Sequence, residues 1–221
     1  MCFYSRQSKE ALLAAKRFKA EVRDPEQFLT SDFINGFSHP SCPVITSDNP
    51  GLISNFTWGL IPQWSDKDSV SNYTLNARIE TLNQINSFRD YVNNRCLVVA
   101  DGFYEWRHER RAGRTFKDRY LITLPDNDLF AFAGLYSHWR DPATNILKGT
   151  FTILTTTASD IMSNIHNTKK RMPVILKKED ENSWLEGFPV NNFAYPYSIE
   201  LSAFYSPESN EKRGDPSSLL F

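Results

Sequence analysis

Apolar, strand-forming stretches crowd the middle of the sequence and leave little room for helices between them. Four such stretches follow one another, at Cys96–Trp106, Tyr120–Leu124, Leu129–Trp139 and Phe151–Thr156. The polar, arginine-rich stretch 107–118 links the first two and predicts a long hairpin. Strands without crossover helices between them pair antiparallel. We therefore predict an α+β fold with a curled, barrel-like, mostly antiparallel sheet and scattered helices.

Shorter elements complete the predicted fold. We expect helices at 8–18, from Thr81 to about Asn94, at 157–165 and at Glu179–Leu185, and short strands at Pro43–Thr46, Phe56–Ile61 and Met172–Leu176. Ser8 is the expected N-cap of the first helix, and Thr81 and Gln84 have the spacing of a capping box. A chain of 221 residues, 40% of them hydrophobic, can bury one large core. We predict a single domain over residues 1–205 and a polar tail over residues 206–221.

Several classes of protein are excluded by what the sequence lacks. It has no apolar run of about eighteen residues that would predict a membrane span, and its N-terminus lacks the pattern of a secretory signal. Three cysteines (2, 42 and 96) form an odd, sparse set without metal-ligand spacing, which is typical of a reduced, intracellular setting. The four histidines lie far apart, so we expect no metal and no other cofactor. The formal charge of −1 means that any contact with nucleic acid must be local.

Cys2 directly follows Met1, so the loss of one residue would make a cysteine the amino terminus. Such a cysteine carries an α-amine and a thiol on adjacent carbons. The amine can form an imine with an aldehyde, and the thiol can then close a five-membered thiazolidine ring. The two groups titrate near ~7.7–8.0 and ~8.5, so small shifts make both nucleophilic at neutral pH. The alternative is that Cys2 follows the start by chance.

Two further stretches carry candidate polar groups. Glu105 lies beside Phe103 on the predicted strand and is flanked by two aromatic residues, so we expect its carboxyl to be partly desolvated and its pKa raised, which suits proton donation. The alternative is an exposed strand-end glutamate that pairs with an arginine. Asn76, Arg78 and Glu80 share one face of an extended segment, where arginine can bind a phosphate or pair with Glu80.

Aromatic residues and a histidine provide the remaining candidates. Trp58 and Trp64 bracket a proline-containing loop, and each is either a core residue or a stacking platform for a base, worth ~1–3 kcal/mol. His166 follows a predicted short helix. It is either a favourable partner of the helix dipole or an acid–base group in a groove.

Taken in order along the chain, these motifs resemble the SRAP family, the SOS response-associated peptidases. The motifs are Met1-Cys2, Trp58–Trp64, Asn76–Glu80, Asp101–Trp106, Leu154-Thr155, Ile165-His166 and Arg171–Pro173. The resemblance runs from Cys2 to about Leu176. It implies a protein that shields abasic sites in single-stranded DNA by a thiazolidine cross-link, after removing its own Met1, with associated abasic lyase activity in the response to DNA damage.

The resemblance also implies roles for particular residues. Cys2 would be the nucleophile, Asn76 would hold its amine, Glu105 would shuttle protons, and His166 would assist. The implied DNA contacts are Arg78, Trp64, Thr155, Trp58 and Arg171. We expect a monomer without metal, acting in the cytoplasm and at the nucleoid when engaged on DNA.

The chain departs from the family pattern at its start, and two other functions compete with the implied one. Family members commonly begin Met-Cys-Gly-Arg, whereas this chain has Phe3 and Tyr4; Arg6 is a candidate substitute for the usual phosphate contact. An N-terminal-nucleophile amidohydrolase would also unmask Cys2, but predicts four-layer packing with more helix. A non-covalent single-stranded DNA-binding module would be indifferent to Cys2→Ala.

Overall fold

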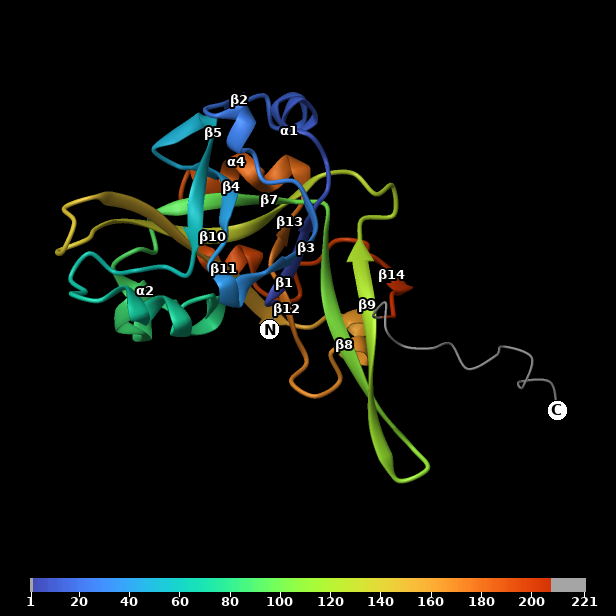
Figure 1. Cartoon of the computed structure of the whole chain (residues 1–221). Helices are drawn as coiled ribbons and strands as arrows, with labels where there is room; N and C mark the ends of the chain where they lie inside the picture. The colour runs from blue at the N-terminus through green and yellow to red at the C-terminus, as the bar shows by residue number, and fades with distance from the viewer. Residues whose placement is uncertain (1, 208–221) are drawn as a thin grey trace.

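The computed structural model describes residues 2–207 and contains a closed five-stranded barrel (Figure 1). Its pairs are antiparallel except for a parallel pairing of the first and last strands, which joins Thr57 to Thr150 and closes the ring. This confirms the predicted curled, mostly antiparallel sheet. In order around the barrel, the strands are β5 (Asn49–Trp58), β4 (Ser41–Thr46), β7 (Arg95–Ala100), β10 (Phe130–Arg140) and β11 (Leu147–Thr157).

A second, five-stranded antiparallel sheet packs beside the barrel. Its strands, in order, are β14 (Ser202–Tyr205), β9 (Arg114–Thr123), β8 (Gly102–Arg111), β1 (Tyr4–Gln7) and β3 (Ser31–Asn35). Four short strands extend the barrel sheet, namely β2 (Glu21–Val22), β6 (Asn76–Arg78), β12 (Arg171–Pro173) and β13 (Ile175–Leu176).

The predicted strand Cys96–Trp106 is wrong as a single element, because the chain bends at Asp101 and changes sheet. The buried Asp101 carboxylate accepts hydrogen bonds from the backbone N–H and hydroxyl of Ser8 and lies 3.1 Å from the Arg6 guanidinium. Ser8 therefore does not cap a helix, and α1 begins at Ala11. The bend also resets the side-chain alternation, so that Ala100 and Phe103 enter the same core cluster.

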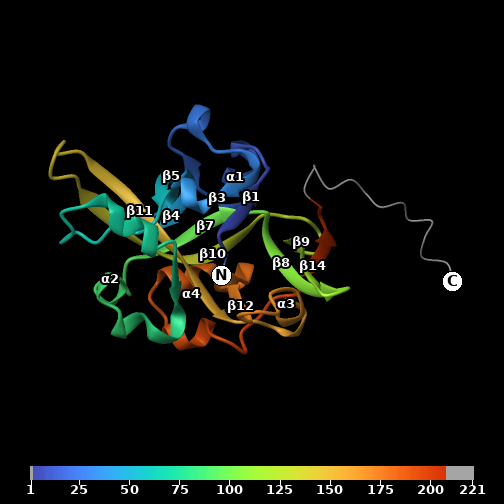
Figure 2. The ribbon, with the colours of Figure 1, turned by 60° about the horizontal axis from the view of Figure 1, so that its bottom comes forward.

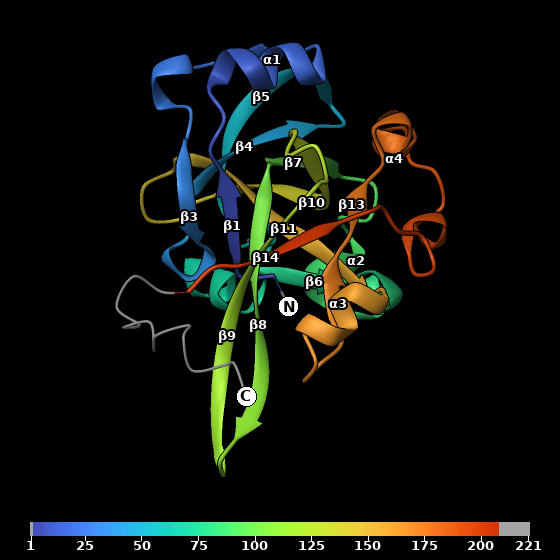
Figure 3. The same cartoon turned by 90° about the vertical axis from the view of Figure 1, so that its right-hand side faces the viewer.

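The arginine-rich stretch forms the predicted long hairpin. β8 and β9 stay in register out to Arg111 and Arg114, and the two-residue turn Ala112-Gly113 has positive φ angles of 48° and 78°. Both central residues with positive φ form the kind of turn that matches the twist of paired strands. Figure 3 shows this hairpin projecting well beyond the rest of the fold.

The helices of the described part are short and lie around the sheets, as Figure 2 shows. The α-helices are α1 (Ala11–Phe18), α2 (Asn86–Arg89), α3 (Asp160–Ile165) and α4 (Glu181–Leu185), and the 3-10 helices are η1 (Pro25–Gln27), η2 (Gly36–Ser38), η3 (Asp68–Tyr73), η4 (Ile79–Gln84), η5 (Lys178–Asp180) and η6 (Val190–Phe193). The predicted helix from Thr81 to Asn94 is wrong, because only η4 and the single turn α2 form there. Its four asparagines, which have low helix propensity, explain the failure. No helix among residues 2–207 is long and apolar enough to cross a membrane.

Alternate residues of the barrel strands contribute to two separate core clusters. One cluster packs against α1 and α4 and contains Ala14 and Trp184. The other contains Cys2 and Phe103 and joins the barrel to the second sheet. Cys2, at the start of the described chain, thus lies in the core where the barrel and the second sheet pack together. Met1 and residues 208–221, most of the predicted polar tail, lie outside the described residues, and the domain boundary at residue 205 stays a prediction.

Candidate active site

Cys2 is positioned by β1, the strand of the second sheet that begins two residues later. β1 pairs with β8 on one side, with Ser5 opposite Phe103, and with β3 on the other. Continuing this antiparallel register by two residues brings Phe3 opposite Glu105. The backbone N–H of Gly36 donates to the Phe3 carbonyl at 2.8 Å. Cys2 itself is fully buried, so its position is set by the surrounding structure and not by solvent contact.

Asn76 links the barrel directly to Cys2. It opens β6, whose parallel pairing with β11 sets Asn76 opposite Ile153. Its Nδ2 donates to the carbonyl oxygen of Cys2 at 2.9 Å. Its Oδ1 is buried and has no hydrogen-bond partner within residues 2–207. The side chain therefore anchors the Cys2 backbone and keeps a hydrogen-bond acceptor beside it; the predicted contact with the amine stays a prediction.

Glu105 acts electrostatically on the Cys2 thiol. Glu105 is only 5% exposed, and burial raises its pKa from 4.5 to about 7. Burial also raises the pKa of the Cys2 thiol far above its ordinary value, and the negative charge of Glu105 raises it further. The expected desolvated carboxyl is therefore present, beside a thiol that is protonated at neutral pH.

His166 approaches the same site from the C-terminus of α3. Its Nδ1 lies 2.7 Å from the carbonyl oxygen of Arg171. Because a carbonyl only accepts, Nδ1 carries the proton, and Nε2 is the basic nitrogen of the neutral ring. Burial lowers the pKa of His166, which favours this neutral form.

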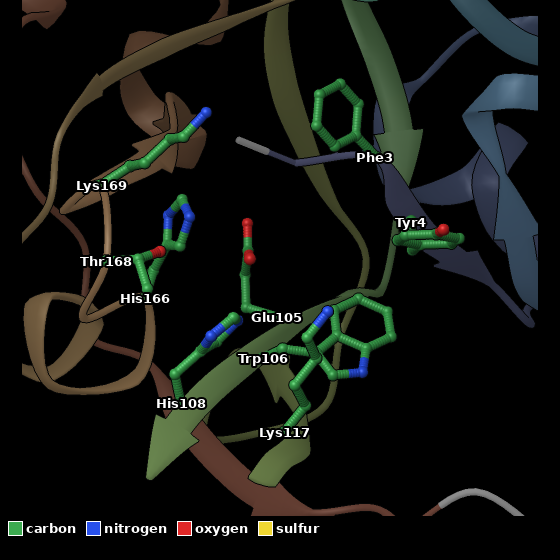
Figure 4. Close-up of a pocket in the computed structure, with 9 residues that line it drawn as sticks. All are labelled: Phe3, Tyr4, Glu105, Trp106, His108, Lys117, His166, Thr168 and Lys169. Carbon is green, nitrogen blue, oxygen red and sulfur yellow. The ribbon is translucent and has the colours of Figure 1, made fainter. Parts of the chain in front are cut away.

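Glu105 and His166 point into one pocket of about 620 Å³ (Figure 4). The pocket has an aromatic side from β1 and β8 and a cationic side from the hairpin and the segment after α3. Its lining residues are Phe3, Tyr4, Glu105, Trp106, His108, Lys117, His166, Thr168 and Lys169. Lys117 and Lys169 were not among the site residues predicted from the sequence, although both lie in basic stretches. Only the register of the hairpin and the loop after α3 brings their side chains to the pocket.

The predicted DNA contacts divide into exposed and buried residues. Arg78 is exposed next to the site on β6, and Trp64 is 57% exposed. Trp58 is wrong as a stacking platform, because it is fully buried, stacks on Phe151 at 6.0 Å and donates its indole N–H to the Leu75 carbonyl at 2.8 Å. It is the core residue that the alternative interpretation describes.

Thr155 and Arg171 are also buried and bind protein groups. Arg171 donates two hydrogen bonds of 2.8 Å to the Glu80 carboxylate and a third, of 2.7 Å, to the carbonyl oxygen of Thr155. Both residues therefore brace β6, β11 and β12 through protein contacts, and their predicted contact with DNA stays a prediction. Glu80 pairs with Arg171, so the alternative local pair between Arg78 and Glu80 is wrong as well.

Arg6, the candidate substitute for a phosphate contact, is occupied within the protein. Its guanidinium lies 3.1 Å from Asp101 and donates to the Asn127 side chain at 2.6 Å. Across residues 2–207, no group of three or more His, Cys, Asp or Glu side chains has the arrangement of a metal site.

Comparisons with known proteins agree with this geometry. A family model described as SOS response associated peptidase (SRAP) matches residues 1–200. The chain is 42% identical to the abasic site processing protein YoqW of Bacillus subtilis (strain 168) over 171 residues, which cover 72% of this chain and 73% of the relative. It is 30% identical to the mouse (Mus musculus) abasic site processing protein HMCES over 210 residues, 77% of this chain and 57% of the relative.

Two solved structures share the fold. A protein from Bacteroides thetaiotaomicron superposes with a TM-score of 0.84 at 30% identity, over 98% of this chain and 97% of the other. A protein from Bordetella bronchiseptica superposes with a TM-score of 0.75 at 24% identity, over 94% of this chain and 100% of the other. The second likeness concerns the fold alone.

Proposed function

Since the chain belongs to the SOS response-associated peptidase family, we infer that it processes abasic sites in DNA as part of the response to DNA damage. Relatives from a bacterium and from a mammal carry the name abasic site processing protein. An abasic site exists partly as an open-chain aldehyde, and an N-terminal cysteine is suited to capture this group.

We propose that the protein hydrolyses its own Met1–Cys2 peptide bond, which consumes one water and releases methionine and the free α-amine of Cys2. Cys2 then becomes linked covalently to abasic sites in single-stranded DNA. The α-amine of Cys2 attacks the aldehyde carbon, and an imine forms with loss of one water. The thiol then adds to the imine carbon, and its proton ends on the nitrogen, which closes the thiazolidine. Before the thiol adds, the imine also permits β-elimination of the 3′ phosphate, which would appear as abasic lyase activity.

The contact between Asn76 and Cys2, with Glu105 beside them, is the observation that carries this proposal. The hydrogen bond of 2.9 Å from Asn76 fixes the Cys2 carbonyl, and so the adjoining Cα, which carries the amine and, through Cβ, the thiol. Glu105, with a pKa of about 7, can give a proton to the sugar ring oxygen as the ring opens and take one from the thiol as the thiazolidine closes. The Nε2 of His166 provides a second basic atom in the pocket.

The DNA strand would reach the pocket along its exposed rim. Arg78 and Trp64 are exposed candidates for phosphate and base contacts, and Lys117 and Lys169 supply positive charge in the pocket. We propose that the protein acts as a monomer in the cytoplasm, at the nucleoid when engaged on DNA.

The test is to mix the protein with a single-stranded oligonucleotide that carries one abasic site, and to analyse it by denaturing gel and intact mass. A heat-stable adduct that lacks Met1 and disappears in Cys2→Ala is expected. Cys42→Ala is the matched control, because Cys42 is an equally buried thiol without an α-amine. If Met1 is absent and no adduct forms, the covalent proposal is wrong.

Two alternatives make different predictions. An N-terminal-nucleophile amidohydrolase calls for four-layer packing, whereas residues 2–207 form a barrel and a second sheet with helices of at most eight residues. A non-covalent single-stranded DNA-binding module would bind equally well after Cys2→Ala and would form no adduct at all.

A further inference from the structure

A cluster of aromatic rings covers part of the second sheet, next to the pocket but distinct from the reacting groups. We call it the aromatic cluster, and its members are Phe3, Tyr4, Phe33, Phe37, Tyr104 and Trp106. Tyr4 is central: it stacks on Phe33 with ring centroids 5.1 Å apart and meets the edge of Trp106 at 4.9 Å. Phe3 packs against Phe37 at 4.7 Å. The rings therefore form one connected surface across β1, β3, η2 and β8.

The outer members of the aromatic cluster are exposed. Phe33 is 41% exposed and Phe37 is 52% exposed, whereas the inner members Phe3, Tyr4 and Trp106 are partly buried and also line the pocket. The apolar surface thus runs without interruption from the pocket to the outside of the sheet. Two neighbouring, half-exposed phenylalanines contribute little to the core, and apolar surface of this kind marks an interaction site.

Positive charge accompanies these rings. The Arg119 guanidinium lies 5.5 Å from the Phe33 ring centroid and 5.2 Å from that of Tyr104. Lys117 and Lys169 line the adjoining pocket. Aromatic faces beside cations are the combination that binds single-stranded nucleic acid, since bases stack on the rings and phosphates meet the cations.

We propose that the aromatic cluster is a subsite for unpaired bases, with Phe33 and Phe37 as its stacking faces for the nucleotides that flank the abasic site. The inference rests on the proposed function, because the strand must enter the pocket where Glu105 lies. An abasic nucleotide offers no base for stacking, so its neighbours lose a stacking partner within the strand. The exposed rings replace that partner and direct the strand toward Cys2.

The experiment measures non-covalent binding, so it does not depend on adduct formation. Cys2→Ala protein is titrated into single-stranded oligonucleotides that carry 2-aminopurine next to a stable abasic analogue, and fluorescence and anisotropy are followed. Stacking on Phe33 and Phe37 should quench 2-aminopurine. Adding Phe33→Ala or Phe37→Ala should remove the quenching and raise Kd about tenfold each, the lower part of the range for one base–aromatic contact.

Matched variants separate stacking from general effects. Phe188→Ala removes a ring that is 48% exposed three residues after α4, and it should leave Kd within twofold of the parent. Figure 3 shows α4 on the opposite side of the fold from β3. Phe37→Trp should keep tight binding, while Phe37→Leu, which keeps apolar surface without an aromatic face, should lose it.

The inference is overturned if Phe33→Ala and Phe37→Ala bind as tightly as Phe188→Ala. It is also overturned if the rings instead mediate self-association, seen as a concentration-dependent dimer that both variants abolish without a change in Kd. Absence of an adduct in the Cys2-containing parent, with quenching intact, would contradict the covalent proposal and leave the base subsite supported.

Discussion

Replacing Glu105 by glutamine should stabilise the protein at alkaline pH while weakening its chemistry. Burial raises the pKa of Glu105 from 4.5 to about 7. At about 1.36 kcal/mol per pKa unit, the ionised carboxylate costs the folded state about 3 kcal/mol. Between pH 4.5 and 7 the folded chain binds this proton and the unfolded chain does not, so stability falls as the pH rises, and the full cost is present above about pH 7.

The amide of Glu105→Gln has nearly the same shape and no charge at any of these pH values. The variant should therefore be about 3 kcal/mol more stable than the parent at pH 8 and equal to it near pH 4. For a chain of this size, that difference corresponds to about 6–12 °C in Tm. Urea unfolding of both proteins at the two pH values measures it, because the other titrating groups are common to both chains and cancel.

Glu181→Gln is the matched control for a buried glutamate. Its carboxylate forms a 2.7 Å ion pair with Arg17, and both side chains are 9% exposed. Burial raises the pKa of Glu181 as well, but the ion pair with Arg17 opposes that shift, and removing the charge leaves the buried Arg17 without its partner; this variant should therefore gain less stability at pH 8 than Glu105→Gln. If Glu105→Gln and the parent are equally stable at pH 8, burial does not destabilise the ionised Glu105 carboxylate and the reasoning is refuted.

Three further predictions concern Asn76, the pair Trp58 and Trp64, and Glu80. Asn76→Ala removes the hydrogen bond to the Cys2 carbonyl, so adduct formation, followed by mass against time, should slow about tenfold, while stability falls by only about 1 kcal/mol. Trp58→Ala should cost about 3–5 kcal/mol in urea unfolding because it empties a fully buried site, whereas Trp64→Ala should change stability by less than about 0.5 kcal/mol and weaken binding of single-stranded DNA. Burial opposes ionisation of Glu80, but hydrogen bonds from Arg171 prevail and hold its pKa below the ordinary value; Glu80→Gln should therefore destabilise the protein at pH 7 and lose this effect as the pH falls through that lowered pKa.

Local patterns in the sequence predicted the barrel but not its closure or the second sheet. Apolar residues identify the barrel strands in the sequence. A strand that buries one face shows alternating apolar residues, and a strand that buries both faces shows a continuous apolar run. The parallel pairing of β5 with β11 joins residues almost a hundred positions apart, and no local signal encodes it. The bend at Asp101 was likewise invisible, since it depends on hydrogen bonds from Ser8 and an ion pair with Arg6 that form only in the fold.

In the candidate site, too, local sequence predicted some features, whereas others depend on tertiary contacts. The raised pKa of Glu105 was predictable because its aromatic neighbours are adjacent in sequence. The burial of Thr155 and Arg171 was not, because Arg171 could meet a phosphate or a carboxylate equally well, and only tertiary structure brings Glu80 within 2.8 Å of it. The aromatic cluster was missed because its rings come from three separate strands and one 3-10 helix.

The proposed chemistry needs an acid and a base at one position, and burial of Glu105 provides both. Opening the sugar ring requires a proton donor, whereas closing the thiazolidine requires an acceptor for the thiol proton. An exposed glutamate with a pKa of 4.5 would be protonated in only about one molecule in 300 at pH 7. With a pKa of about 7, Glu105 is protonated in about half of the molecules. Burial and the Glu105 charge both disfavour the Cys2 thiolate, so in the proposed order of steps the thiol would keep its proton until the imine has formed. The burial that lowers stability is therefore the property that lets one carboxyl serve both steps.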